Sequence, residues 1–286
     1  MDEPTVILKA RGFIRSFETL SFPVPVESYV EKVNATLRYE TDLPKGEAGY
    51  SVPIAGKWHI VVNIKDHPER QRFTICHEVA HLHLGLSSEH AGKSDTQSYT
   101  KRPQKEIFCD VFAAETLLPS DLFKPLVDEA VIGFKSLTAL AGDFQASLTA
   151  TGSRFAALNQ WPCAFVLAER GIIRYASRSL SLKEMSAWIP IGYRVPPSSV
   201  AAKGCNLTEE GSQTVDPAEW FEDWNRGGTL LEEARYLTEW DRTISLLWFE
   251  DKEFFTRQSE GYDEDSDPVC RELDGDLPWP SKKRRR

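Results

Sequence analysis

The residues best able to do chemistry are two histidines four positions apart, His77 and His81, with Glu78 directly after the first. An α-helix places positions i and i+4 on one face, so the two imidazoles can hold a single metal ion. The glutamate between them can then take a proton from a water molecule bound to that ion. This spacing indicates a hydrolytic metal site, because two imidazoles and one further ligand leave a fourth position open for water.

The third ligand must come from another part of the chain. A third histidine at metzincin spacing is missing, because Leu84 and Ser87 occupy the positions that this pattern needs. Glu106 is the better candidate, since the segment that it begins lacks Gly and Pro and reads as a second helix. Asp110 follows four residues later on the same face, where it can accept the N–H of a ligand imidazole. Glu115 is the alternative third ligand and ranks below Glu106.

Two stretches of the chain resemble the ImmA/IrrE family of metallopeptidases. The first runs from Arg70 to His81 and contains the His-Glu-x-x-His pattern, and the second runs from Glu106 to Pro119. The strand expected at Ile60–Asn63 also fits this family, as the strand before the metal helix. Cys109 stands where the family is expected to have Ala. The resemblance extends over roughly residues 5–160, and it implies an intracellular peptidase that acts on helix-turn-helix repressors.

The elements around these motifs predict an α+β fold, in which a small, mainly helical zinc-peptidase domain contains a short sheet. Helices are expected at about residues 5–20 and 25–36, and in the segments that carry the two motifs. A hairpin-like stretch leads into a strand at Trp58–Asn63, which alternates as a strand packed on one face does. If this strand lies at the edge of the sheet, its backbone can pair with an extended substrate. An interior position is the alternative.

The expected organisation has four parts along the chain. After the zinc-peptidase domain comes a helical segment that resembles a helix-turn-helix, then a small β-rich domain, and then a disordered tail. For the β-rich domain, the resemblance implies a GAF-like fold. The expected bounds are 1–125, 126–160, 161–258 and 259–286.

The helix-turn-helix resemblance of residues 126–160 admits two interpretations. A DNA-reading motif needs basic side chains for the phosphates, and Lys135 and Arg154 are the only basic residues in this segment. A pair of packing helices is therefore the favoured interpretation.

The composition of the chain indicates the cellular compartment and the kinds of partner to expect. The chain has 286 residues, a formal net charge of −9 and five cysteines, and an odd, scattered set argues against a disulfide framework. No apolar run is long enough to span a membrane, and the acidic start of the chain is unlike a signal peptide. Acidic residues gather at 206–276 before a basic end at 282–286, and such an acidic region repels nucleic acid. These features predict a cytoplasmic protein that does not bind nucleic acid directly.

Other histidine and cysteine side chains near the motifs are not expected to bind the metal. The remaining histidines are expected to be surface or packing residues, and the cysteines beside the motifs, Cys76 and Cys109, to be small buried side chains. A residue that stabilises the oxyanion of the reaction is also expected, and its candidates are Tyr50, His59 and Tyr99.

The sequence therefore predicts a cytoplasmic zinc-dependent endopeptidase. His77, His81 and Glu106 are the expected ligands, Glu78 the general base and acid, and Asp110 the acceptor that orients a ligand imidazole. Manganese or iron also suits two histidines and a carboxylate. The expected partner is a protein substrate, a helix-turn-helix repressor whose cleavage switches on genes of a stress response or a mobile element. Two alternatives stay open: an inactive protein that sequesters a repressor, and a DNA-binding regulator with its own helix-turn-helix.

Overall fold

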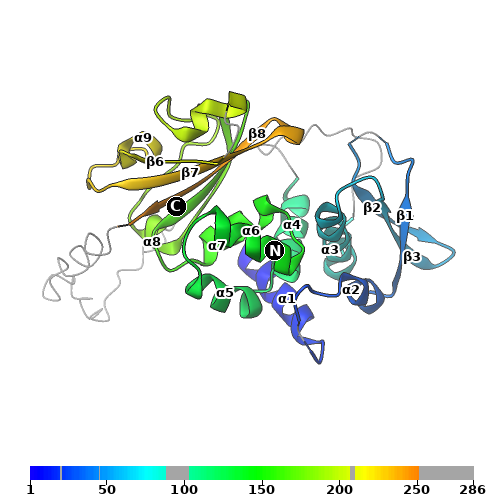
Figure 1. Ribbon diagram of the computed structural model, residues 1–286. Coiled ribbons are helices and arrows are strands. Elements are labelled where there is room, and N and C mark those ends of the chain that lie inside the picture. Colours follow the sequence, from blue (N-terminus) through cyan, green and yellow to red (C-terminus); the bar gives the residue numbers. More distant parts are fainter. Residues whose placement is uncertain (20, 45, 88–102, 207–209, 251–286) are drawn as a thin grey trace, which may run out of the picture. The chain divides into compact units, whose positions relative to one another are not determined.

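A computed structural model of the protein describes residues 1–19, 21–44, 46–87, 103–206 and 210–250 (Figure 1). Residues Met1–Phe249 form one compact unit. Helices and two sheets together give this unit the α+β fold that the sequence predicts. Among the helices of these described ranges, none has the length and apolar character needed to span a membrane.

The first part of the unit contains a three-stranded sheet and seven α-helices among the described residues. Their bounds are α1 (Glu3–Arg15), α2 (Val26–Lys32), β1 (Ala35–Glu40), β2 (Gly49–Ile54), β3 (Lys57–Asn63), α3 (Pro68–Leu84), α4 (Gln104–Leu117), α5 (Ser120–Glu129), α6 (Phe134–Phe144) and α7 (Leu148–Leu158).

The second part is built on a five-stranded sheet with short helical turns. Its elements are β4 (Cys163–Glu169), β5 (Ile172–Arg178), α8 (Leu180–Glu184), η1 (Val200–Asn206), β6 (Gly211–Val215), α9 (Pro217–Trp220), β7 (Leu230–Leu237), η2 (Thr238–Trp240) and β8 (Arg242–Phe249). The strand order is β5-β4-β8-β7-β6, and all neighbouring strands are antiparallel.

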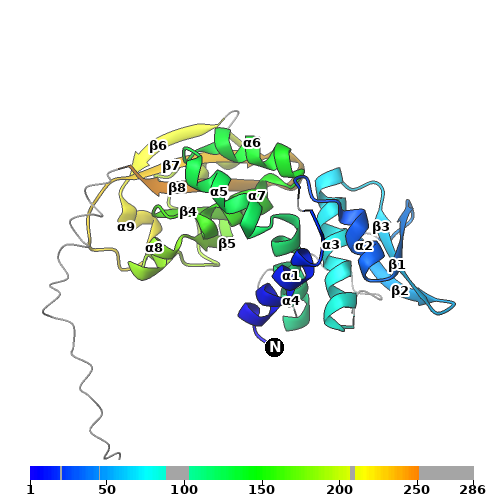
Figure 2. The same cartoon turned by 90° about the horizontal axis from the view of Figure 1, so that it is seen from below.

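Helix α3 carries the His-Glu-x-x-His motif and lies between the three-stranded sheet and α4 (Figures 1 and 2). Pro68 occupies its first turn, where the missing N–H of proline costs nothing, and Gly85 ends it in the left-handed conformation at φ 66°. All residues from Thr74 to His81 are buried. A helix that is buried on every side must have neighbours on opposite faces, so both motif histidines point into protein rather than solvent.

The strand before α3, β3, lies in the centre of the three-stranded sheet. It runs parallel to β1 and antiparallel to β2. The hypothesis that Trp58–Asn63 binds substrate as an edge strand is therefore wrong, because both of its edges are already paired. The expectation failed because of β1: α2 ends at Lys32, and Asn34 turns the chain with φ 54°, so Ala35–Glu40 forms a strand where the helix 25–36 was expected to end.

The hairpin of β2 and β3 sets how closely the sheet approaches α3. Its turn is Ala55-Gly56, with φ values of 50° and 80°. At the start of β2, a Cβ atom on Gly49 would lie 2.6 Å from Thr74 Cγ2 and 2.5 Å from the carbonyl oxygen of Val61. Glycine is therefore required where β2 meets α3.

The segment expected to resemble a helix-turn-helix forms the helices α6 and α7. Each residue from 148 to 156 is buried or half-buried, and α7 packs against β4 and β5. Arg154, one of the two basic residues of the segment, donates hydrogen bonds to Glu115 and to the carbonyl oxygen of Leu118. The second helix of the pair is thus covered by protein, which supports the interpretation as packing helices.

The hydrophobic core is continuous across the boundary expected between residues 160 and 161. Phe155 of α7 and Phe165 of β4 belong to the same buried cluster, which also includes residues of α1, α3 and β8. The four-part division of the chain stays a prediction, and the expected tail at 259–286 lies outside the described residues.

Gly152→Ala is expected to lower the free energy of unfolding by about 1–3 kcal/mol. The added methyl group would lie 2.3 Å from Phe165 Cε2, so α7 and β4 would have to move apart. Urea unfolding followed by circular dichroism measures the effect. The matched control is Gly142→Ala in α6, where nothing lies within 4 Å of the added Cβ. This control is expected to be neutral or stabilising, by up to about 1 kcal/mol. Equal stability of the two variants would contradict the packing of α7 on β4.

Candidate metal centre

Three side chains from α3 and α4 meet in the interior of the protein. The Nε2 atoms of His77 and His81 are 3.1 Å apart, and Glu106 Oε2 lies 3.2 Å from the first and 3.4 Å from the second. All three residues are buried, with exposed fractions of 6%, 1% and 5% respectively. The structure thus brings together the residues that the sequence predicts as ligands, and their roles stay predictions.

The outer nitrogen of each imidazole faces a hydrogen-bond acceptor. His77 Nδ1 lies 2.9 Å from Asp110 Oδ1, and His81 Nδ1 lies 3.2 Å from the carbonyl oxygen of Leu86. A proton at Nδ1 in both rings leaves the two Nε2 lone pairs directed at each other and at the Glu106 carboxylate. Three electron-rich atoms at such short distances repel one another unless a positive charge lies between them.

The spacing of these three atoms fits a tetrahedral ion of the zinc class. Zinc binds imidazole nitrogen and carboxylate oxygen at about 2.0–2.1 Å, so two ligand atoms of a tetrahedral site are about 3.3 Å apart. The separations among His77 Nε2, His81 Nε2 and Glu106 Oε2 are 3.1, 3.2 and 3.4 Å. The donor set and its spacing therefore suit a metal ion.

The charges around His77 also favour a positive ion at this site. Burial lowers the pKa of His77, but its hydrogen bonds with Asp110 and Glu106 and the charges of Asp110 and Glu78 outweigh burial and raise the pKa to about 9. Glu78 is itself only 1% exposed. These carboxylates favour a positive charge at the site, and a metal ion would supply it in place of a proton.

Asp110→Ala is expected to weaken metal binding by about 10- to 100-fold without unfolding the protein. The reason is that the substitution removes the acceptor that holds His77 Nδ1–H and lets the ring turn away. Competition with a chelating dye measures the affinity. Asp110→Asn keeps an acceptor oxygen and should lose less, whereas Asp128→Ala, which removes the exposed partner of Lys124, should lose nothing. Equal affinities of Asp110→Ala and the wild type would contradict the orienting role.

The backbone acceptor for His81 comes from the end of α3, and the sequence reasoning did not find it. Gly85 adopts the left-handed conformation, and the N–H of Leu86 then donates to the carbonyl oxygen of His81 at 2.9 Å. This turn brings the Leu86 carbonyl back to the His81 ring. The signal was present in the sequence as the glycine stop, although its consequence for His81 depends on the geometry of the turn.

Glu115, the alternative third ligand, is engaged elsewhere. It is 1% exposed, forms ion pairs with Arg11 of α1 and Arg154 of α7, and accepts a hydrogen bond from Ser120 Oγ at 2.7 Å. Burial raises the pKa of Glu115, but the Arg154 charge and these hydrogen bonds outweigh it and lower the pKa. Glu115 therefore ties α1, α4 and α7 together, and Glu106 is the glutamate at the site.

Cys109 lies closer to the site than its interpretation as a packing residue implied. It is fully buried, and its sulfur and one ring nitrogen from each of His77 and His81 all lie within 4.8 Å of one another. The Glu106 oxygen is nearer to both rings, at 3.2 and 3.4 Å, and remains the better third ligand.

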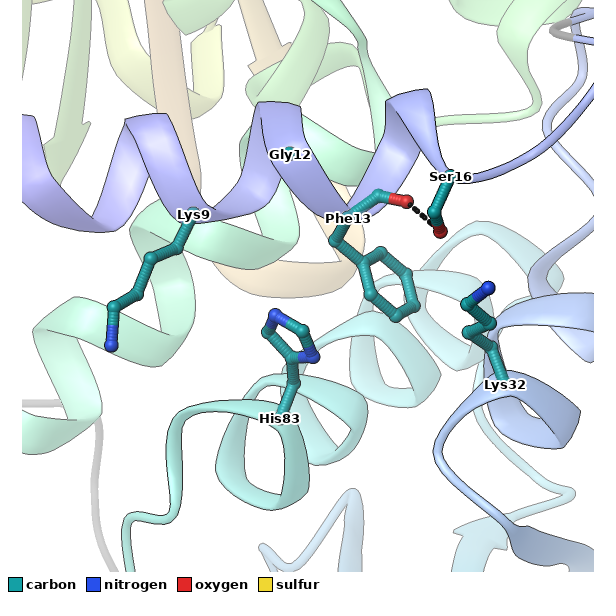
Figure 3. Close-up of a pocket in the computed structure, with 6 residues that line it drawn as sticks. All are labelled: Lys9, Gly12, Phe13, Ser16, Lys32 and His83. Atoms are coloured by element: carbon teal, nitrogen blue, oxygen red, sulfur yellow. Dashed lines mark hydrogen bonds between the residues drawn. The ribbon is translucent and has the colours of Figure 1, made fainter.

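The remaining candidates lie on α3, β2 and β3 or outside the described residues. His83 packs against Phe13 and Phe112, with ring centroids 4.8 and 5.4 Å away. It lines an open hollow of about 450 Å³ between α1, α2 and the end of α3, which agrees with its interpretation as a packing residue (Figure 3). Of the oxyanion candidates, Tyr50 lies on β2 and His59 on β3, while Tyr99 lies outside the described residues. The residues that line the hollow together with His83 are Lys9, Gly12, Phe13, Ser16 and Lys32.

The fold and the site together define an α+β domain with a buried His-Glu-x-x-His helix and a carboxylate on the adjacent helix, which is the class of the metallopeptidase-like domains. Residues 30–155 match the family model Peptidase_M78, the IrrE N-terminal-like domain. This match spans both motif helices and confirms the resemblance. Residues 30–155 are thus similar to a domain of the ImmA/IrrE family.

Among solved structures, a Mycobacterium tuberculosis transcriptional regulator is similar to this chain, with a TM-score of 0.57 and 12% sequence identity. The similarity covers 85% of this chain and 76% of that one. At this identity the similarity shows a shared fold. A comparison with curated proteins finds no match.

Proposed function

We propose that the protein is a zinc-dependent endopeptidase. The observation that carries this proposal is the buried triangle of His77 Nε2, His81 Nε2 and Glu106 Oε2, with Glu78 on the same helix. The match to a peptidase family supports it. A zinc ion held by these three residues would lower the pKa of a bound water toward about 7 and polarise the peptide carbonyl. The same donors also suit manganese or iron.

The protein's own side chains and backbone would transfer the proton and orient the ligands. The Glu78 carboxylate accepts a proton from the attacking water and then delivers it to the nitrogen of the leaving amine. Asp110 and the Leu86 carbonyl hold the Nδ1 protons of His77 and His81, which keeps both Nε2 atoms directed at Glu106. The surrounding buried residues exclude bulk water, which strengthens each of these interactions.

We propose that the substrate is a helix-turn-helix transcriptional repressor, whose cleavage switches on genes of a stress response or a mobile element. The family resemblance implies such a substrate, and the similar solved structure is described as a transcriptional regulator. A repressor of this kind works on DNA inside the cell, so the proposal places the enzyme in the cytoplasm. The β-rich part, expected to be GAF-like, would then be a regulatory domain.

Of the two alternative functions, direct DNA binding has the weaker support. The helix that would enter the DNA groove, α7, is covered by β4 and β5, and its Arg154 is paired with Glu115. The second alternative, an inactive protein that binds and sequesters a repressor, is favoured by one observation. The Cys109 sulfur lies within 4.8 Å of a ring nitrogen of both His77 and His81, and a metal bound by four protein ligands would have no position for water.

A cleavage assay tests the proposed function. The full chain is incubated with the purified repressor encoded beside its gene, with and without added zinc, and the products are examined by gel electrophoresis and mass spectrometry. We expect metal-dependent cleavage at a defined bond. A stable complex with an uncut repressor would instead support the sequestering protein.

A further inference from the structure

We propose that Cys109 is a fourth ligand of the metal site and holds the site in a closed, inactive state. This inference rests on the proposed function, because it describes how the same site is regulated. It assigns a chemical role to a thiol at the position where the family resemblance predicts Ala.

The placement of Cys109 on α4 supports this role. It follows Glu106 by three residues and precedes Asp110 by one, so all three side chains lie on the face of α4 that is turned toward α3. Its sulfur lies within 4.8 Å of a ring nitrogen of both His77 and His81, and the residue is fully buried. Among the described residues, no other cysteine belongs to such a group.

The distances allow the sulfur to coordinate with a small movement. Zinc binds thiolate at about 2.3 Å and imidazole at about 2.05 Å, so sulfur and nitrogen of one tetrahedral site are about 3.5 Å apart. The two separations between the Cys109 sulfur and the ring nitrogens are each at most 4.8 Å, so each exceeds this value by at most about 1.3 Å. A rotation of the short side chain can provide that movement, and thiolate is a preferred ligand of zinc.

A fourth protein ligand would change what the site can do. Zinc sites with four protein ligands are structural, whereas hydrolytic sites keep one position for water. With Cys109 bound, Glu78 has no water to deprotonate. Opening of the site would break the bond between sulfur and metal, the thiolate would take up a proton from solvent, and a water molecule would take the position that the sulfur leaves. The step needs no oxidant or reductant.

Cobalt substitution tests the assignment without any substrate. The full chain is stripped of metal and reloaded with cobalt(II) under nitrogen, because cobalt–thiolate bonds absorb strongly in the near ultraviolet and cobalt bound only by nitrogen and oxygen does not. We expect the band in the wild type, its loss in Cys109→Ala and its retention in Cys76→Ala. Cys76 is the matched control, since it is equally buried, directly precedes His77 and lies outside the group.

Two results would overturn the proposal: no band in a wild type that binds one cobalt per chain, or a band that persists in Cys109→Ala. A second measurement needs no variant, in case Cys109→Ala fails to fold. X-ray absorption of the zinc-loaded wild type should show one sulfur at about 2.3 Å. A shell of nitrogen and oxygen alone would equally refute the assignment.

The repressor assay separates this inference from the proposed function. Cys109→Ala is expected to cleave the repressor several-fold faster than the wild type, while Cys76→Ala matches the wild type. Cleavage by a wild type that shows no sulfur ligand would overturn the inference and leave the peptidase intact. A sulfur ligand together with no cleavage by either the wild type or Cys109→Ala would overturn the peptidase and leave the ligand assigned. Equal rates for the wild type and Cys109→Ala would contradict the closed state.

Discussion

Glu78→Gln is expected to lower the rate of cleavage by about 10²- to 10⁴-fold or more while leaving the metal content unchanged. Glutamine has nearly the shape of glutamate and also accepts hydrogen bonds, but it cannot take up a proton at neutral pH. The substitution therefore separates a general base from a ligand. At a residue that is 1% exposed, a change of similar shape also avoids the packing defect that alanine would cause.

Two measurements on the same preparation show whether Glu78 acts as a general base or as a metal ligand. Elemental analysis gives the metal content, and the rate of repressor cleavage gives the turnover. Glu69→Gln is the matched control, because it makes the same substitution in the first turn of the same helix. Unchanged cleavage by Glu78→Gln would refute the mechanism whatever the metal content. Loss of the metal would instead identify Glu78 as a ligand.

His81→Ala is expected to abolish metal binding. The wild type should carry about one zinc-class ion per chain after purification, because metal and folded ligands stabilise each other. Removal of the His81 ring leaves His77 and Glu106 as the remaining members of the triangle, and it also leaves a space in the interior. The same variant should therefore show no metal-dependent cleavage.

Elemental analysis of the purified variant measures this effect. His83→Ala is the control, since it makes the same substitution two residues later, where the ring packs on Phe13 and Phe112. We expect His83→Ala to lose some stability and to keep the ion. Full metal occupancy in His81→Ala would refute the assignment of His81 as a ligand. Loss of the ion in both variants would show that the metal is sensitive to any damage to α3.

The local part of the site followed from the sequence. His77 and His81 lie side by side because an α-helix repeats every 3.6 residues, a property of the backbone that needs no distant contact. Glu106 and Asp110 share a face of α4 for the same reason. The order of helices and the strand before α3 also followed from patterns within short segments, and so did the α+β class.

The parts that depended on distant contacts could be found only in the folded chain. β3 is central because β1, which precedes it by some twenty residues, pairs with its other edge, and no pattern within Trp58–Asn63 records that pairing. Glu115 was a ligand candidate by spacing, but Arg11 and Arg154 from two other helices engage it.

The surroundings of the two histidines were settled in the same way. Local periodicity directs the rings of His77 and His81 to one face of α3, but it does not determine which atoms of other segments lie next to them. The contact of α4 with α3 brings Asp110 to His77 and the Cys109 sulfur near both rings, and the turn at Gly85 returns the Leu86 carbonyl to His81. Helical periodicity is encoded within a few residues, whereas these contacts arise from packing that involves the whole chain.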